Sequence, residues 1–198
     1  MMKEKNINLG KIIIPILLSG GIGVFPTDTI YGVIGSALQK ETVERIYKLR
    51  KRELKKPMII LISSLNDLKK FGIKLNAEQK KTISQLWPGK VSIVFDCFSE
   101  KFKYLHRGKQ TLAFRLPQYK WLRDFLDKTG SLIASSANIA GEKPSETCSE
   151  ARKYFKNEVD FYVDAGKIKS KPSTLVKLER SGEIKILRQG ASKIKIQS

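Results

Sequence analysis

Polar side chains that could bind a ligand follow a predicted strand near the start of the chain. The apolar run Ile22–Phe25 predicts a buried strand, and Thr27, Asp28, Thr29 and Tyr31 come directly after it. Hydroxyl and carboxylate groups at the end of a strand can hydrogen-bond a polar molecule. The same residue types also build ordinary turns, in which hydroxyls bond the local backbone. Taken alone, this segment leaves both interpretations open.

Three cationic side chains, Arg50, Lys51 and Arg52, lie at the end of a predicted helix, Glu41–Arg50. Guanidinium groups suit phosphate because they offer two parallel, charge-assisted hydrogen bonds. Cations at the carboxyl end of a helix are also favourable in the helix dipole, with no ligand involved. Phosphate binding and simple helix stabilisation are therefore alternative hypotheses for this cluster.

Further polar residues lie beside later strands. Ser136 and Asn138 follow the apolar segment Leu132–Ala134 at its carboxyl end, the usual ligand side of an α/β sheet. Further strands are predicted at Thr111–Arg115, Thr174–Leu178 and Ile184–Leu187, and a further helix is predicted at Glu146–Phe155.

Several common catalytic arrangements are absent from the sequence. The only histidine, His106, lies in a segment rich in Lys and Arg, so no Ser-His-Asp triad is predicted and we expect His106 on the surface. No Walker or dinucleotide-binding glycine motif occurs, because Gly20-Gly21-Ile22-Gly23 precedes its strand. Cys97 and Cys148 lack Cys or His partners in the sequence, which indicates neither a zinc site nor a disulfide framework.

Taken in order, these segments resemble a known family. Pro26-Thr27-Asp28-Thr29-Ile30-Tyr31-Gly32 is similar to the opening motif of the YrdC/TsaC family of threonylcarbamoyl-AMP synthases. Three further matches follow in the family's order: Arg50-Lys51-Arg52 with Pro57, Ser135-Ser136-Ala137-Asn138 with Gly141, and Pro172-Ser173-Thr174 followed by Leu187-Arg188-Gln189-Gly190. The resemblance runs from Gly20 to Gly190, nearly the whole chain.

The resemblance implies a role for each matching residue. Arg50 and Arg52 would be catalytic. ATP would be bound by Arg50, Lys51, Arg52, Thr111, Ser136, Asn138, Thr147 and Arg188. L-threonine would be bound by Thr27, Tyr31, Arg115 and Ser173. Mg²⁺ would accompany ATP, without dedicated protein ligands.

The sequence departs from the family pattern in two places. The family has Lys-x-Arg after the second helix, and an ungapped alignment between Ile46 and Pro57 puts Arg50 at the lysine position. Lys48-Leu49-Arg50 also matches Lys-x-Arg, but only after a shift of the helix by two residues. A histidine that usually follows the family's Arg-x-Pro strand is not clearly supplied by Gln118-Tyr119.

The family reaction that the resemblance implies converts L-threonine, bicarbonate and ATP into threonylcarbamoyl-AMP and pyrophosphate, for threonylcarbamoyl-adenosine in tRNA. Nucleotidyl transfer needs alignment and charge neutralisation more than a covalent nucleophile, so the absence of a triad is no objection. Expected partners are the three substrates and tRNA or tRNA-modification proteins. Two alternatives remain: a YciO-like relative with altered activity, which Arg50 keeps open, and a non-catalytic RNA-binding module.

We expect one YrdC-like domain over residues 1–198, with a motif-bearing core from about 8 to 190. The alternation of predicted strands and helices indicates an α/β sheet flanked by helices. The resemblance implies a twisted, mixed parallel and antiparallel sheet around a basic cavity. Other expected elements are the helices Asn8–Ser19, Asn76–Leu86 (with a capping box to Gln79) and Trp121–Asp127, and the strands Pro57–Ile62, Val91–Phe95 and Phe161–Val163.

The chain is strongly basic, with 38 Lys and Arg against 19 Asp and Glu and a formal net charge of +19. Such a surface attracts polyanions. Genomic base composition is an alternative source of the lysines from Lys167 to Lys195, although not of arginines inside motifs. The apolar run Ile12–Leu18 is shorter than the roughly 20 residues that span a bilayer. Without a signal peptide or paired cysteines, the sequence predicts a reducing cytoplasm.

Overall fold

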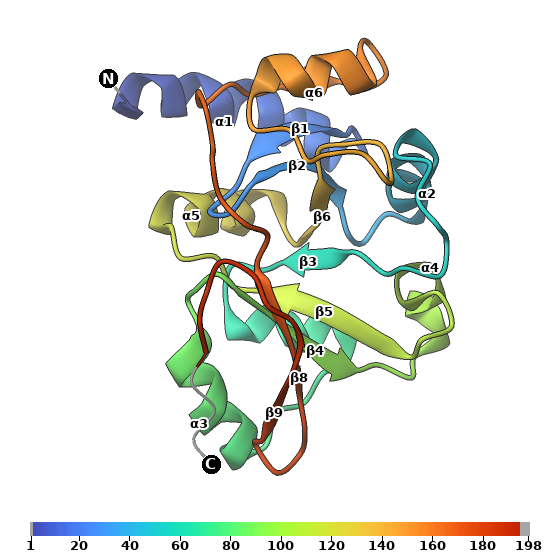
Figure 1. Ribbon diagram of the computed structural model, residues 1–198, viewed down its shortest axis with the longest axis vertical. Helices are drawn as coiled ribbons and strands as arrows, with labels where there is room; N and C mark the ends of the chain where they lie inside the picture. Colours follow the sequence, from blue (N-terminus) through green and yellow to red (C-terminus); the bar gives the residue numbers. More distant parts are fainter. Residues whose placement is uncertain (1, 195–198) are drawn as a thin grey trace.

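The computed structural model describes residues 2–194 (Figure 1). Its helices are α1 (Met2–Leu18), α2 (Lys40–Leu49), α3 (Ala77–Leu86), α4 (Lys103–His106), α5 (Lys120–Thr129) and α6 (Cys148–Phe155), with 3₁₀ helices η1 (Leu65–Phe71) and η2 (Glu100–Phe102). Its strands are β1 (Gly23–Pro26), β2 (Tyr31–Ser36), β3 (Ile59–Leu61), β4 (Val91–Asp96), β5 (Thr111–Arg115), β6 (Leu132–Ser136), β7 (Phe161–Tyr162), β8 (Thr174–Leu178) and β9 (Ile184–Arg188).

The strands form one nine-stranded sheet in the order β7-β1-β2-β6-β3-β5-β4-β8-β9. The pairs β1–β7, β3–β5 and β4–β8 are parallel, and the other neighbours are antiparallel. The predicted mixed α/β sheet is therefore confirmed. Strands far apart in sequence lie together at its centre, where the antiparallel pair β3–β6 joins the two halves.

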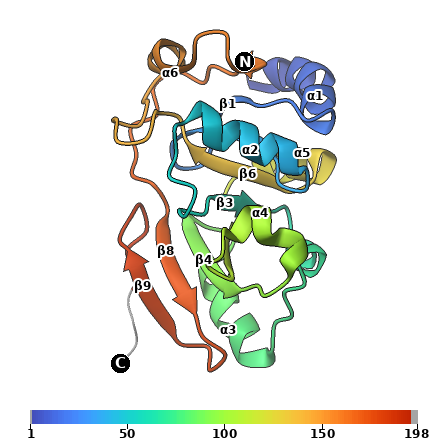
Figure 2. The ribbon, with the colours of Figure 1, turned by 90° about the vertical axis from the view of Figure 1, so that its right-hand side faces the viewer.

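Each face of the sheet has its own apolar core. One core packs α2, η1, α3 and α4 against inward side chains of the central strands, including Ile60, Phe114 and Ile133. The other packs α1 and α5 against Phe25 and Ile34, near β1 and β2. Figure 2 shows the segment between β7 and β8 descending along one side of the molecule, past the edge of the sheet.

Strand β2 was not among the predicted strands. Its sequence, Tyr-Gly-Val-Ile-Gly-Ser, contains two glycines, and glycine normally weakens a strand. A Cβ placed on Gly35 would come within 2.5 Å of Cγ2 of Thr42 in α2. The glycine therefore allows α2 to pack closely on the sheet, and this tertiary requirement outweighs the local preference.

Two other expectations differ from the structure. Helix α1 begins at Met2, six residues before the predicted start at Asn8, and includes Pro15 in its interior. His106 is buried, at 1% exposure, because α4 turns it inward, where its Nδ1 accepts a hydrogen bond from the Gly108 amide at 3.1 Å. The prediction that His106 lies on the surface is wrong. Within residues 2–194, no helix has the length and apolar character to cross a membrane.

Candidate active site

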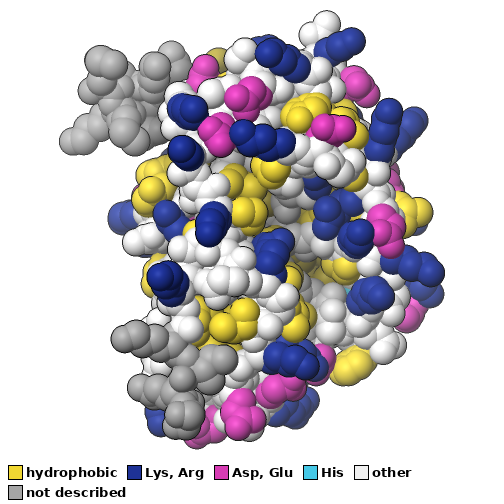
Figure 3. Space-filling model, viewed as in Figure 1, with side chains coloured by type: hydrophobic (Ala, Val, Ile, Leu, Met, Phe, Trp, Pro, Cys, Tyr) yellow, Lys and Arg dark blue, Asp and Glu magenta, His cyan; other side chains and the backbone are white. Residues whose placement is uncertain are grey.

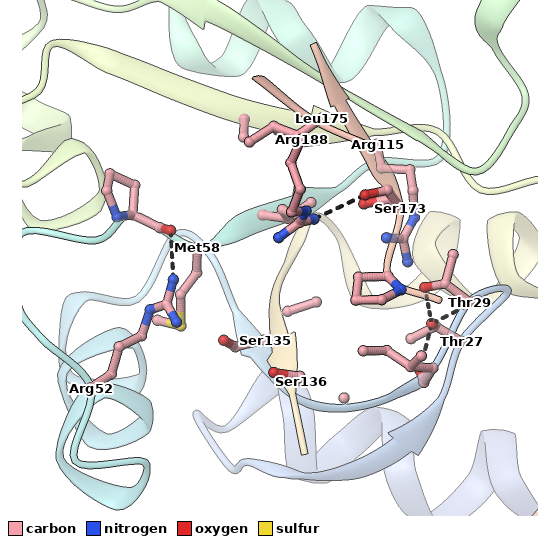
Figure 4. A pocket seen from close by; sticks show the side chains of 17 residues that line it. Thr27, Thr29, Arg52, Met58, Arg115, Ser135, Ser136, Ser173, Leu175 and Arg188 are labelled. Carbon is pink, nitrogen blue, oxygen red and sulfur yellow. Dashed lines mark hydrogen bonds between the residues drawn. The ribbon is translucent and has the colours of Figure 1, made fainter. Parts of the chain in front are cut away.

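A cavity of about 240 Å³ opens in the sheet face between the two halves of the molecule. In the space-filling view this face is hollowed near its middle, with Lys and Arg side chains around the hollow (Figure 3). Figure 4 shows the side chains that line the cavity. They are Thr27, Thr29, Ile30, Gly32, Arg52, Pro57, Met58, Ile59, Ala113, Arg115, Ala134, Ser135, Ser136, Pro172, Ser173, Leu175 and Arg188.

The lining carries three arginines, Arg52, Arg115 and Arg188, and no acidic residue. Burial lowers the pKa of Arg52. Burial, followed by the charges of Arg115 and Arg52, also lowers the pKa of Arg188. A lowered pKa means that the positive charge is poorly compensated where it sits. The negative charge of an anion in the cavity would compensate these arginines for their lost hydration and would reduce the repulsion between them.

The buried ion pair between Arg115 and Asp28 joins β5 to the turn after β1. Nη2 of Arg115 lies 3.0 Å from Oδ1 of Asp28, with side-chain exposures of 5% and 0%. Asp28 Oδ2 also accepts a hydrogen bond from the Gln118 amide at 3.1 Å. Burial lowers the pKa of Arg115, and the Asp28 carboxylate opposes that shift. Asp28 therefore positions Arg115 at the cavity wall.

The turn between β1 and β2 lies against one wall of the cavity. The Thr27 hydroxyl donates to the Ile30 carbonyl at 2.7 Å and accepts from the Thr29 amide at 3.2 Å. The Thr27 hydroxyl therefore stabilises the turn, as expected if these residues only bond the local backbone. Thr27 and Thr29 nonetheless line the cavity, so both interpretations of the segment describe part of the structure.

Ser173 and Arg188 lie together at another part of the cavity wall. Arg188 Nη2 donates to the Ser173 carbonyl at 2.9 Å (Figure 4). The Ser173 hydroxyl lies 2.8 Å from that of Ser92. A Cβ on Gly190 would overlap the Pro172 carbonyl oxygen, so glycine is needed where the chain after β9 passes this wall.

The three cations at the end of α2, Arg50, Lys51 and Arg52, lie in different environments. Arg52 lines the cavity and is held by hydrogen bonds from Nε to the Lys56 carbonyl at 2.9 Å and from Nη2 to the Pro57 carbonyl at 3.1 Å. Arg50 is turned inward and is 2% exposed, and burial, followed by the charge of Arg52, lowers its pKa to about 10. Lys48 and Lys51 are both exposed, and neither lines the cavity.

Four other predicted residues lie outside the cavity lining. Asn138 is buried behind it, and its Nδ2 donates to the carbonyls of its own loop. Thr147 caps α6 by accepting from the Glu150 amide at 3.1 Å, and Thr111 begins β5. The Tyr31 hydroxyl accepts from the Ala165 amide at 2.8 Å, so Tyr31 anchors the segment that leads to β8. Of the predicted set, the cavity brings together Thr27, Arg52, Arg115, Ser136, Ser173 and Arg188.

Sequence reasoning assigned no role to several residues that line the cavity. Ser135 lies within a matched motif, so its motif context was a usable signal. Met58, Ala113 and Leu175 are apolar side chains of ordinary strand segments, and nothing in the sequence marks them. Their side chains add nonpolar surface to a cavity that also carries arginines and hydroxyls.

A mixed sheet with an arginine-lined cavity at its centre defines an α/β protein with a cationic cavity. The Sua5–YciO–YrdC family, described as "Telomere recombination", matches residues 15–190. This chain therefore belongs to the Sua5–YciO–YrdC family.

Two curated relatives are similar over most of the chain. A "Putative threonylcarbamoyl-AMP synthase" of Methanocaldococcus jannaschii is 32% identical over 175 residues, which are 88% of this chain and 82% of the relative. A "Threonylcarbamoyl-AMP synthase" of Halorhodospira halophila is 27% identical over 176 residues, 88% of each chain.

Solved structures share the fold. P. abyssi Sua5 complexed with L-threonine has a TM-score of 0.82 and 26% identity, over 91% of this chain and 54% of that one. This chain thus spans about half the length of that relative. YciO of E. coli has a TM-score of 0.83 over 96% of this chain and 92% of that one, with 19% identity, which supports the fold alone.

Proposed function

We propose that this chain is an L-threonylcarbamoyladenylate synthase, which forms threonylcarbamoyl-AMP and pyrophosphate from L-threonine, bicarbonate and ATP for tRNA modification. The observation that carries the proposal is the cavity lined by three arginines, by no acidic residue and by the hydroxyls of Thr27, Ser136 and Ser173. A relative of the same family binds L-threonine, and the curated relatives carry the name of this activity. The buried free thiols of Cys97 and Cys148 fit a reducing compartment such as the cytoplasm.

The proposed reaction has two steps. The threonine nitrogen attacks the bicarbonate carbon, and loss of water leaves a carbamate. A carbamate oxygen then attacks the α-phosphorus of ATP, and the bond to the β-phosphate breaks to release pyrophosphate. The reaction needs no covalent enzyme intermediate, only alignment and stabilisation of developing charge.

The cavity residues can be divided between threonine and ATP. Arg115 would pair with the threonine carboxylate, beside the hydroxyls of Thr27 and Ser173. Arg52 and Arg188 would offset the negative charge that accumulates on the phosphates. The cavity position of these arginines supports this role, and burial, which lowers the pKa of both, leaves their charges poorly compensated by the protein.

Mg²⁺ would accompany ATP as part of this proposal. Within residues 2–194, no group of three or more His, Cys, Asp or Glu side chains is arranged to hold a metal ion. Oxygens of the triphosphate would bind the metal, and Arg52 and Arg188 would contact the phosphates. The metal would help to neutralise charge on the leaving pyrophosphate.

Pyrophosphate release by the purified chain with ATP and Mg²⁺ tests the proposal. It should require threonine and bicarbonate together. The arginine at position 50 keeps open a YciO-like protein with altered activity, although Arg52 and Ser136-Ala137-Asn138 argue against it. That alternative predicts ATP turnover indifferent to threonine, and a non-catalytic RNA-binding module predicts no turnover at all.

A further inference from the structure

Arg50 directs all of its side-chain hydrogen bonds to one short segment at the end of β6. Nε donates to the Asn138 carbonyl at 2.9 Å, and Nη2 donates to Asn138 Oδ1 at 3.2 Å and Ser136 Oγ at 3.1 Å. Nη1 donates to the Ser135 hydroxyl. The Arg50 carbonyl also accepts from the Ala140 amide at 2.8 Å. Backbone and side chain together therefore tie the end of α2 to this segment.

These bonds decide how the two serine hydroxyls are oriented. A guanidinium has donors only, so Ser135 and Ser136 must accept from it and keep their own hydrogens for another acceptor. Neither hydroxyl has a second hydrogen-bond partner within the described part of the chain. Both serines line the cavity, on the side that Arg52 faces (Figure 4).

We infer that Arg50 is a positioning residue that fixes Ser135 and Ser136 as hydrogen-bond donors to a phosphate oxyanion in the cavity, without touching the ligand itself. Arg50 is absent from the cavity lining and 2% exposed, so direct contact with a phosphate is not open to it. A hydroxyl that accepts a charge-assisted bond is polarised and becomes a better donor. The inference rests on the proposed function only for the identity of the anion as part of ATP.

Lysine cannot reproduce this arrangement. Its donors share a single nitrogen, whereas the Arg50 fork reaches two serine hydroxyls and both oxygens of Asn138. Arg50→Lys therefore keeps the positive charge but cannot make the hydrogen bonds to both serine hydroxyls and to Asn138 at once. A direct electrostatic role predicts near-normal binding in this variant, and a positioning role predicts a loss.

The test is a double-mutant cycle read by titration calorimetry with pyrophosphate as the probe. The variants are Arg50→Lys, the pair Ser135→Ala with Ser136→Ala, and all three changes together. We expect the first two to weaken pyrophosphate binding about 10- to 100-fold, as for lost hydrogen bonds to a charged group. We expect the triple variant to bind no more weakly than either, because the arginine acts through the serines. Lys40→Ala, an exposed charge at the start of α2, should bind as the wild type does.

Several results would overturn the inference. They are normal pyrophosphate affinity in Arg50→Lys, losses that multiply in the triple variant, or a wild type that does not bind pyrophosphate. The serine pair leaves Arg50 in place, so normal affinity there contradicts the inference even if Arg50→Lys does not fold. A cycle that behaves as expected, in a wild type without threonine-dependent turnover, would remove the proposed function and leave this inference standing.

Discussion

At the scale of single residues, loss of one partner of the Asp28–Arg115 ion pair should strongly destabilise the fold, because both side chains are buried. Asp28→Asn would leave the Arg115 charge without a counter-ion, and we expect it to lower the free energy of unfolding by about 3 to 5 kcal/mol. Lys120→Ala removes a partner of Asp124 from an exposed pair and should cost at most about 1 kcal/mol. Urea denaturation measures both. Equal effects would show that the buried pair is not the anchor of this wall.

Arg52 and Lys48 separate the two ways of aligning the helix end with the family motif. Arg52 lines the cavity and Lys48 is exposed. Arg52→Ala should lower kcat/KM by about 100- to 1000-fold, the effect of removing one preorganised electrostatic donor. Lys48→Ala should leave it unchanged. Steady-state pyrophosphate release gives both values, and the reverse ranking would favour the shifted alignment.

The sequence predicted which residue types form the site better than it predicted their individual environments. Thr27, Arg52, Arg115, Ser136, Ser173 and Arg188 meet at one cavity, because each lies at a strand end or in a loop beside one. His106 and Arg50 were the harder cases. A local run of Lys and Arg suggests solvent for His106, but only the packing of α4 decides its direction. Arg50 is charged and lies at a helix end, yet its partners are far along the chain at 135–138.

At the scale of elements, the chain after β9 must pass close to the Pro172–Ser173 wall. Gly190→Ala would place a methyl group against the Pro172 carbonyl, and relief of that overlap must shift β9 and with it Arg188. We expect a loss of about 1 to 3 kcal/mol in unfolding free energy, together with reduced ATP affinity. Thermal melts and ATP titration measure the two effects.

Gly10→Ala is a matched control for that variant. Gly10 lies inside α1, where its Cβ would meet only ordinary contacts. Alanine is favoured over glycine in a helix interior by roughly 0.5 to 1 kcal/mol, so this change should stabilise the protein and leave ATP affinity intact. If Gly190→Ala were equally harmless, the close approach at this wall would be unimportant for the site.

Strong local signals account for the elements that were predicted well. The Asn76–Gln79 capping box starts α3 as expected, and β5 and β8 have the predicted bounds. Strand β2 was missed because its glycines serve the packing of α2, which a local pattern does not reveal. The order of strands in the sheet is likewise set by contacts between distant segments, such as β3 with β6. Here the family resemblance, rather than periodicity, supplied the prediction of a mixed sheet.

At the scale of the whole molecule, the net charge of +19 should favour association with tRNA. Binding of this kind releases counterions from phosphates, so affinity should fall steeply and linearly in log–log form as salt rises. Filter binding of tRNA between about 50 and 200 mM salt measures the slope. No association at the lowest salt would make genomic base composition the better explanation of the lysines.

The central claim is that the arginine-lined cavity joins threonine, bicarbonate and ATP. The most direct measurement is pyrophosphate release by the wild-type chain with ATP and Mg²⁺, in four reactions that contain threonine, bicarbonate, both or neither, with the adenylate product identified by mass. The account predicts release and threonylcarbamoyl-AMP only when both are present. Release that is independent of either substrate, or an adenylate without the threonylcarbamoyl group, would contradict it.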